Sequence, residues 1–279
     1  MNKSAKEFDF TKHHFDVLRG LVNRHTGITL ADSKMELVYG RLARRLRALN
    51  ISSFDQYCRM LKTDPGDELN NFVNAITTNK TDFFREMHHF EYLTNTALPY
   101  LLKERKNTKR IRIWSAGCST GQEPYSIAMV IHDAVRDLAN WDVKILATDI
   151  DSNVINTARN GVYQQEQIKL LPQDITKKWF SYGSGENAGK VKVAEKLKDI
   201  ISFKVLNLME QWPMKGKFDI LFCRNVVIYF NKSTQAVLFD RFAEYLQEDG
   251  ILFIGHSESL HNISNKYDHI GQTIHKKKA

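Results

Sequence analysis

The sequence contains few cysteines and lacks any long apolar run. Its three cysteines, Cys58, Cys118 and Cys223, are odd in number and widely spaced, and they match no zinc-binding pattern. This usage favours a reducing compartment, so we expect a cytoplasmic protein without a structural metal. No apolar run approaches the ~20 residues that cross a bilayer, and residues 1–7 have no signal-peptide core. We therefore expect no direct membrane insertion.

The positive charge of the chain is unevenly distributed. The formal net charge is +8, and residues 34–47 supply +4 of it, because five Lys and Arg side chains there are offset only by Glu36. A helix over 37–49 would place its leucines on one face, Arg44 and Arg47 on the opposite face, and Arg41 at the flank. Such a face fits a nucleic acid, a membrane surface or an acidic protein helix, and a merely solvated helix face is an equal alternative.

Two periodicities divide the chain. Residues 8 to about 105 read as helical, whereas from residue 110 onward strand-like apolar segments alternate with helical stretches. The predicted strands are 111–116, 143–149, 201–206, 218–223 and 250–255, and the predicted helices are 123–138, 151–159 and 233–247. This alternation predicts a doubly wound, mostly parallel α/β sheet whose ligands bind beyond the carboxyl ends of the strands. We expect a helical N-terminal domain over 8–90 and a sheet domain over 91–279.

Two segments depart from this alternation. Residues 160–200 contain the glycine-rich stretch 182–193, which leads into a short strand. We expect 160–200 to form a small inserted β-subdomain at the edge of the sheet. Residues 267–275, with Gly271 at their centre, could supply an antiparallel strand.

The segment 111–126 is the most informative part of the chain. A β-rich run enters a turn of small residues at 117–121, and a helical stretch follows. Glycine tolerates unusual dihedrals and a helix N-terminus offers unpaired N–H groups, so a ligand can approach bare backbone here. The second strand ends at Asp149, whose carboxylate could accept both hydroxyls of a ribose. An ordinary βαβ unit, in which the glycines only shape a turn, is the alternative.

Four strand ends should converge on one crevice. They are the turn 117–121, Asp149, the pair Asn207 and Leu208, and the segment 224–226. The Asn207 amide could read the edge of an adenine. Asn225 follows a buried-looking strand, where a polar residue is hard to explain by packing, although a locally satisfied turn residue is the alternative. Tyr229 could also be a core aromatic whose hydroxyl reaches the rim.

Five longer strings make the family of the chain recognisable. They are Asn-Lys-Thr-Asp-Phe-Phe-Arg-Glu (79–86), Ser-Thr-Gly-Gln-Glu-Pro-Tyr-Ser (119–126), Ala-Thr-Asp-Ile-Asp (147–151), Phe-Cys-Arg-Asn-Val-Val-Ile-Tyr-Phe (222–230) and Gly-His-Ser-Glu-Ser (255–259). In this order they resemble the motifs of the chemotaxis receptor methyltransferase family, CheR. The resemblance runs from about residue 15 to residue 275.

The resemblance implies S-adenosylmethionine as methyl donor, S-adenosylhomocysteine as product, no metal, and receptor glutamates as acceptors. It also implies a class I methyltransferase fold with a helical N-terminal domain and a small inserted β-subdomain. The residues that match donor-binding positions are Asn79, Thr81, Arg85, Glu123, Asp149, Asn207, Leu208, Asn225 and Val226. Those that match positions facing the substrate are Arg85, Arg224 and Tyr229.

These residue types suit methyl transfer to a carboxylate. A glutamate has an unperturbed pKa of ~4.3, so the nucleophile is already ionised at neutral pH and no general base is required. The enzyme must align the carboxylate oxygen, the methyl carbon and the sulfur, and exclude water. Arg85 or Arg224 could grip one carboxylate oxygen while the other attacks. Tyr229 could hold the acceptor from another side.

The resemblance also implies partners for the basic face and the inserted subdomain. The arginines expected to recognise acidic, methylatable helices in the cytoplasmic region of the receptors are Arg41, Arg44 and Arg47. Gly183, Gly185 and Gly189 resemble a loop with which some members bind a C-terminal receptor peptide, and Lys192 is expected to contact that peptide as well. Such tethering raises effective concentration. Tyr182 and Lys192, however, stand where the best-known tethering members have arginines.

Three other interpretations stay open. A methyltransferase acting on RNA or on another protein would also combine a donor crevice with a basic extension, but no basic stripe interleaved with aromatics is present. A catalytically silent module could bind the donor as a sensor ligand. A nicotinamide-dependent oxidoreductase is disfavoured because the turn is not Gly-x-Gly-x-x-Gly and lies 32 residues before Asp149, against a usual ~20. We expect a monomer that binds no nucleic acid.

Overall fold

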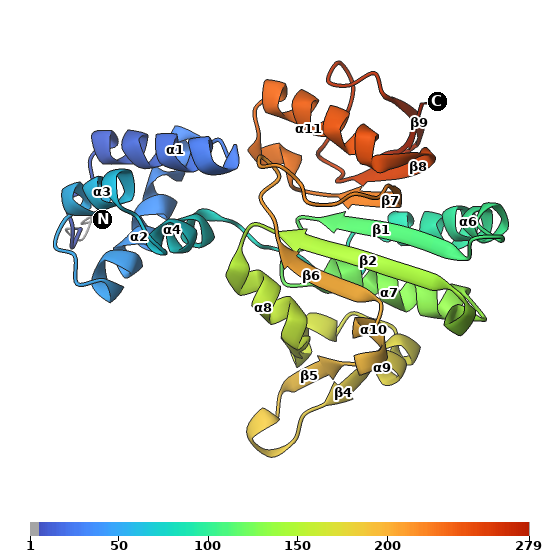
Figure 1. The fold of residues 1–279 in the computed structure, drawn as a ribbon. Helices are drawn as coiled ribbons and strands as arrows, with labels where there is room; N and C mark the ends of the chain where they lie inside the picture. The colour runs from blue at the N-terminus through green and yellow to red at the C-terminus, as the bar shows by residue number, and fades with distance from the viewer. Residues whose placement is uncertain (1–5, 279) are drawn as a thin grey trace.

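The computed structural model describes residues 6–278, so the first five residues of the segment examined for a signal peptide lie outside the described residues. Four helices form an N-terminal unit beside a larger α/β unit (Figure 1). They are α1 (Lys12–Thr26), α2 (Met35–Ala48), α3 (Phe54–Thr63) and α4 (Glu68–Ile76). The Thr11 hydroxyl caps α1 by accepting the His14 N–H, and Gly27 ends that helix in a left-handed conformation. Apolar faces of all four helices enclose one buried core.

The α/β unit is built on a seven-stranded sheet of order β6-β2-β1-β7-β8-β10-β9. The strands are β1 (Arg110–Ala116), β2 (Asp142–Asp149), β6 (Ile201–Val205), β7 (Phe218–Cys223), β8 (Leu246–Ile254), β9 (Tyr267–Gly271) and β10 (Ile274–Lys277). The first five are parallel, whereas β10 pairs antiparallel with both β8 and β9. The predicted mostly parallel sheet is confirmed. The segment 267–275, predicted to supply one antiparallel strand, instead belongs to two strands, because β9 ends at Gly271 and the chain turns back into β10.

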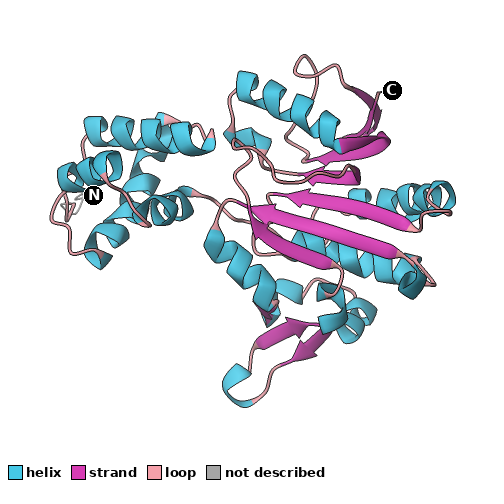
Figure 2. Cartoon of the chain, in the orientation of Figure 1, coloured by secondary structure: helices cyan, strands magenta, loops and turns pink. Residues whose placement is uncertain are grey.

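Helices cover both faces of this sheet (Figure 2). They are α5 (His88–Tyr92), α6 (Leu98–Glu104), α7 (Gln122–Ala134), α8 (Ser152–Asn160) and α11 (Lys232–Tyr245), and a π-helical turn, Leu93–Ala97, joins α5 to α6. Alternate residues of β1 serve the two cores: Ile111 and Ile113 pack with α7, whereas Trp114 packs with α11. Strands at the centre of the sheet, such as β7, are therefore buried on both faces, which explains their nearly continuous apolar sequence.

A small antiparallel sheet is inserted between α8 and β6. It consists of β3 (Val162–Gln164), β5 (Lys190–Val193) and β4 (Phe180–Tyr182), with α9 (Gln173–Trp179) and α10 (Glu195–Lys198) beside it. The predicted inserted β-subdomain is thus present in the fold. It lies next to α8, away from the N-terminal helices (Figure 1).

Three predicted helical stretches are shorter in the structure, and one of them, predicted over 233–247, ends at Tyr245 because β8 begins at Leu246. The helix expected over 123–138 ends at Ala134, because Val135 is extended and buried. Residues 77–87 carry no helix and instead form the connection between the two units. The arrowheads of β1 and β2 point toward this connection and toward the N-terminal helices (Figure 1). Among residues 6–278, no helix is both long and apolar enough to cross a membrane.

Candidate active site

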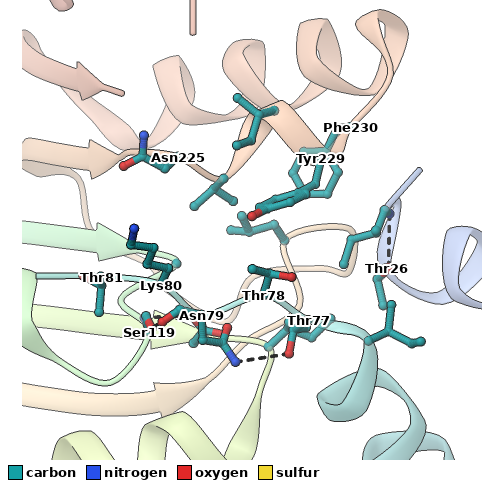
Figure 3. A pocket seen from close by; sticks show the side chains of 18 of the residues that line it. Thr26, Thr77, Thr78, Asn79, Lys80, Thr81, Ser119, Asn225, Tyr229 and Phe230 are labelled. Carbon is teal, nitrogen blue, oxygen red and sulfur yellow. Dashed lines mark hydrogen bonds between the residues drawn. The ribbon is translucent and has the colours of Figure 1, made fainter. Parts of the chain in front are cut away.

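A cavity of about 400 Å³ lies where the carboxyl ends of the parallel strands meet the N-terminal unit. Its walls come from four places in the chain: the start of α2 and the loop before it, the connection 77–85, the strand ends, and the segment 224–230. In Figure 3, Tyr229 and Asn225 lie on one side of the cavity, and Asn79 and Ser119 on the opposite side. The predicted convergence of four strand ends on one crevice is realised here.

The turn after β1 brings bare backbone to the cavity. Gly117 and Gly121 have φ of 84° and 98°, a backbone conformation that residues with a side chain rarely adopt. A Cβ on Gly117 would overlap Val226. The amides of Gly117 and Cys118 donate to the Thr148 carbonyl at 2.8 and 2.9 Å. These bonds join the ends of β1 and β2. Gly117 therefore lets the turn pack directly against Val226.

Asp149 lies at the end of β2 and lines the cavity. Its carboxylate accepts the amides of Ser119 at 2.8 Å and Asp151 at 3.0 Å. Burial raises its pKa to about 6, against the opposing effect of these backbone donors. Each oxygen keeps a second lone pair, so the group can still accept hydroxyls from a ligand.

Arg224 is buried and faces two carboxylates. Its Nη1 donates to Glu123 Oε2 at 3.0 Å, and its Nη2 lies 3.3 Å from Glu86 Oε2 and donates to the Arg85 carbonyl. Glu123 also accepts the Ser115 hydroxyl at 2.7 Å. The guanidinium is thus engaged by groups of the protein itself. Its position indicates a role in holding the site together.

Arg85 sits between two residues with positive φ, Phe84 at 54° and Glu86 at 58°. Phe84 is fixed by its amide, which donates to Ser126 Oγ at 3.0 Å. Such conformations cost energy and persist only where surrounding contacts enforce them. The Arg85 side chain donates to the Lys80 carbonyl at 3.0 Å and reaches the cavity. It is therefore the less committed of the two site arginines.

Glu86 was not predicted as a site residue. Burial would raise its pKa, but the hydrogen bond with His256 at 2.8 Å and the charge of Arg224 lower it to about 2. His89 and His88 place nitrogen atoms near the same carboxylate, and the three potential ligand atoms lie within 4.8 Å of one another. The Arg224 guanidinium beside Glu86 opposes a cation at that position. The sequence signal for Glu86 was its place in the string 79–86.

Asn79 and Asn207 use their side chains within the protein. Asn79 Nδ2 donates to Asp151 Oδ2 at 2.7 Å, and its carbonyl accepts Ser119 Oγ at 2.8 Å. Asn207 Nδ2 donates to the His25 carbonyl at 2.6 Å, which joins the loop after β6 to the end of α1. Both residues line the cavity, as do Thr81 and Leu208. Their contacts brace the connection and the N-terminal unit against the sheet.

The segment 225–229 forms another wall of the cavity. Asn225 has a φ of 59°, and Val226 packs on the Gly117 turn. Tyr229 is half-buried and its carbonyl accepts the Thr29 amide at 2.8 Å, so it is tied to the N-terminal unit. Its ring borders the cavity, as Figure 3 shows, and is not enclosed in the core. The buried carboxylate of Glu258 accepts backbone amides of this segment, a role that sequence reasoning missed.

The arginines of α2 occupy different environments. Arg41 donates to the carbonyls of Ala75, Ile76 and Thr77 at 3.3, 2.6 and 2.6 Å and so caps the end of α4. Arg44 is exposed, with no ion pair among the described residues.

Two further arginines of α2 have acidic neighbours. Arg47 is exposed and lies 3.6 Å from Glu7, whereas Arg45 is a structural ion-pair partner of the buried Glu68. The structure therefore brings Arg44 and Arg47, but not Arg41, to the open face of α2. Lys34 and Leu37, at the start of this helix, line the cavity.

The glycine-rich loop of the inserted sheet lies between β4 and β5. Gly185 has a φ of 58°, and a Cβ on Gly183 would overlap the Asn187 carbonyl. Lys192 on β5 pairs with Glu195 at 2.7 Å, and Tyr182 is 55% exposed. None of these residues lines the cavity. The structure thus separates this loop from the other predicted site residues.

Two family models match the chain. Residues 13–77 match the CheR methyltransferase all-alpha domain, and residues 79–276 match the CheR methyltransferase SAM binding domain. The boundary between the two matches falls in the connection that follows α4. The second match contains all the predicted donor-binding residues.

Curated relatives match nearly the whole chain. Chemotaxis protein methyltransferase 2 of Pseudomonas aeruginosa is 45% identical over 273 residues, which cover 97% of this chain and 95% of that protein. The chemotaxis protein methyltransferases of Salmonella typhimurium and Escherichia coli are 42% and 40% identical, over 94% of this chain and 89% and 90% of theirs. These matches confirm the predicted family and its class of chemistry. The chain belongs to the CheR family of S-adenosylmethionine-dependent methyltransferases.

Proposed function

We propose that this protein transfers methyl groups from S-adenosylmethionine to glutamate side chains in the cytoplasmic region of chemotaxis receptors. The observation that carries the proposal is the cavity itself, whose walls combine the family's donor-binding strings with the first turn of the basic helix α2. The product would be a glutamyl methyl ester and S-adenosylhomocysteine. Each transfer removes one negative charge from the receptor, which supplies a means of sensory adaptation.

The donor is placed along the strand ends. Asp149 accepts the ribose hydroxyls through the lone pairs left free by Ser119 and Asp151. Leu208 and Val226 supply apolar contacts, and Gly117 and Ser119 of the turn border the space taken by the chain that joins ribose to sulfur. The other residues that match donor-binding positions line the cavity around the donor: Asn79, Thr81, Arg85, Glu123, Asn207 and Asn225. Asn79 and Asn207 act through their backbone and their bracing contacts, since their side-chain amides are already engaged.

The acceptor enters between α2 and the segment 225–229. An ionised glutamate needs alignment rather than activation. Arg85, whose side chain makes one hydrogen bond within the protein, grips one carboxylate oxygen. Tyr229 donates its hydroxyl to the acceptor from the opposite wall. The free carboxylate oxygen then forms a bond to the methyl carbon, while the carbon–sulfur bond breaks and its electron pair stays on sulfur.

Arg224 supports methyl transfer indirectly, through its contacts with other residues of the site. Its charge is balanced by Glu86 and Glu123, so it does not bind the acceptor in this arrangement. It holds the Arg85 carbonyl and thereby fixes the backbone that presents Arg85. Arg224 is a positioning residue in this proposal, whereas Arg85 and Tyr229 contact the substrate.

Docking of the receptor is assigned to α2. Arg44 and Arg47 point to solvent on a helix whose first turn borders the cavity, so they can meet the acidic side chains around a methylatable glutamate. Arg41 supports this face by fixing α2 to the end of α4. The glycine-rich loop with Gly183, Gly185 and Lys192 is proposed to bind a C-terminal receptor peptide at a distance from the chemistry. The protein is proposed to work as a cytoplasmic monomer without nucleic acid.

The proposal is tested by incubating the purified protein with methyl-labelled S-adenosylmethionine and receptor-containing membranes. Mild alkali should release the label as methanol, because a carboxyl methyl ester is hydrolysed by base. Arg85→Ala should abolish most of this label while the protein stays folded. Base-stable label would indicate methylation of nitrogen or nucleic acid, and absence of label despite donor binding would indicate a silent module; either result would overturn the proposal.

A further inference from the structure

The turn that follows β8, residues 255–258, carries a buried carboxylate surrounded by backbone amides. Glu258 Oε1 accepts the N–H groups of Val226, Val227 and Ile228 at 2.8, 2.9 and 3.3 Å. Its Oε2 accepts those of Gly255 at 2.6 Å and Asn225 at 3.0 Å. The residue is only 7% exposed. One negative charge thus satisfies a run of consecutive amides in the wall of the cavity.

The same turn also reaches the segment that carries Arg85. His256 Nδ1 hydrogen-bonds to Glu86 Oε1 at 2.8 Å. Glu86 in turn lies 3.3 Å from Arg224 and 3.4 Å from Asn225 Nδ2. The turn therefore contacts two walls of the cavity that are 139 residues apart in sequence, as measured between Glu86 and Asn225.

The turn is also tightly packed against the segment 225–229. A Cβ on Gly255 would overlap the Asn225 side chain and lie 2.8 Å from the Asn225 backbone nitrogen. Asn225 itself has a φ of 59°, a conformation that costs energy for a residue with a side chain. The contacts of the turn are what enforce this conformation. They leave the Asn225 amide directed at Glu258 and the cavity-lining edge of 225–229 in one fixed place.

We propose that the 255–258 turn is the positioning element of the active site. Glu258 holds the backbone of 225–228 in the shape that receives the donor, and His256 holds Glu86 and through it Arg224. Neither residue lines the cavity, so neither contacts the donor or the acceptor. This inference rests on the donor placement proposed above, at Asn225 and Val226.

The test is S-adenosylhomocysteine binding to Glu258→Gln, measured by titration calorimetry on the full chain. The new amide would direct an N–H₂ group at backbone N–H donors, and burying unpaired donors is costly. We expect donor affinity to fall about tenfold or more. In turnover, the KM for the donor should rise more than the KM for the receptor, because the arginines proposed to dock the receptor lie on α2, which this turn does not hold.

Glu68→Gln is the matched control. Glu68 is also 7% exposed and hydrogen-bonded to several groups, but it lies in the N-terminal unit and does not line the cavity. It should lower the melting temperature as much as Glu258→Gln does, with unchanged donor affinity. The binding stoichiometry gives the folded fraction of each variant, so a loss of affinity is separated from a loss of fold.

His256→Ala supplies a variant that cannot fail by unfolding a core, since that side chain is 63% exposed. It should lower turnover several-fold. Unchanged donor affinity in Glu258→Gln would overturn the inference if Asn225→Ala weakens binding. If Asn225→Ala also binds normally, the donor placement itself is wrong and the inference falls with it.

Discussion

The charges around the cavity and the charges on α2 obey different rules. Arg224 is buried and meets two carboxylates, whereas Arg44 is exposed and has no ion pair among the described residues. A buried charge is costly to leave unpaired, so a buried ion pair fixes the positions of the groups around it. An exposed charge is screened by solvent and contributes little to the fold, so it is free to attract a charged partner. In the proposed function, the buried Arg224 positions the site and the exposed Arg44 recruits the acceptor.

The largest effect is expected from Arg224→Met. Removing this guanidinium leaves Glu123 and Glu86 without their nearest positive charge, and breaking a buried ion pair in this way costs about 3–5 kcal/mol. Chemical denaturation should show this loss, and methyl transfer should be nearly abolished. The double variant Arg224→Met with Glu123→Gln should recover part of the stability. A stable single variant would contradict the role assigned to the buried cluster.

Tyr229→Phe tests a side chain that borders the cavity rather than the buried ion pairs that hold the site together. The change removes one hydroxyl that borders the cavity and leaves the ring and the Thr29–Tyr229 backbone bond in place. Turnover should fall about tenfold, the value of one hydrogen bond made to a charged group, with little change in stability or donor affinity. Single-turnover methyl transfer measures it. Equal rates for the variant and the parent would make Tyr229 a packing residue only.

Charge reversal on α2 tests the role proposed for the exposed arginines. Arg44→Glu with Arg47→Glu should raise the KM for the receptor about tenfold and flatten its dependence on salt, while donor affinity is unchanged. The matched control is Lys103→Glu with Lys106→Glu, two exposed lysines in and just after α6, which lies near the strand ends away from the N-terminal helices (Figure 1). A loss of donor affinity in the α2 variant, or the same receptor defect in the control, would contradict a docking role.

The smallest effect concerns Asp149 and pH. Burial raises its pKa to about 6, so the ionised form that best accepts ribose hydroxyls is lost as the pH falls below 6. Donor affinity should be level above pH 7 and fall by up to about tenfold per pH unit below 6. The same raised pKa means that Asp149 favours the folded state below its ordinary pKa and that this contribution disappears as the pH rises through 6. Calorimetric binding from pH 5 to 8 measures the effect, and Asp149→Asn should remove it.

The sequence predicts the sheet well because its central strands are buried on both faces. Segments such as 220–223 are apolar throughout, and polar residues begin where each strand ends. Chain order and strand ends then suffice to bring Asp149 and Asn225 to one edge. The fold class follows from local pattern, since each βαβ step leaves few topologies to consider.

Side-chain partners were beyond the reach of that pattern. A helical wheel places Arg41 at the flank of α2 but cannot show the carbonyls of α4 that it caps. Arg224 looked available for a substrate because Glu86 and Glu123 are distant in sequence. Glu258 lies in a recognised string, yet its role depends on amides about 30 residues away. Contacts of this kind are set by tertiary packing, which periodicity does not encode.

The most direct measurement is peptide mass spectrometry of a receptor cytoplasmic fragment after incubation with S-adenosylmethionine and this protein. The account predicts single methyl groups on glutamate side chains, in helical segments rich in acidic residues. It predicts their loss with Arg85→Ala and their sharp reduction, at low receptor concentration, with the α2 charge reversal. Methyl groups on lysine or arginine side chains, or an unmodified receptor with labelled nucleic acid, would contradict it.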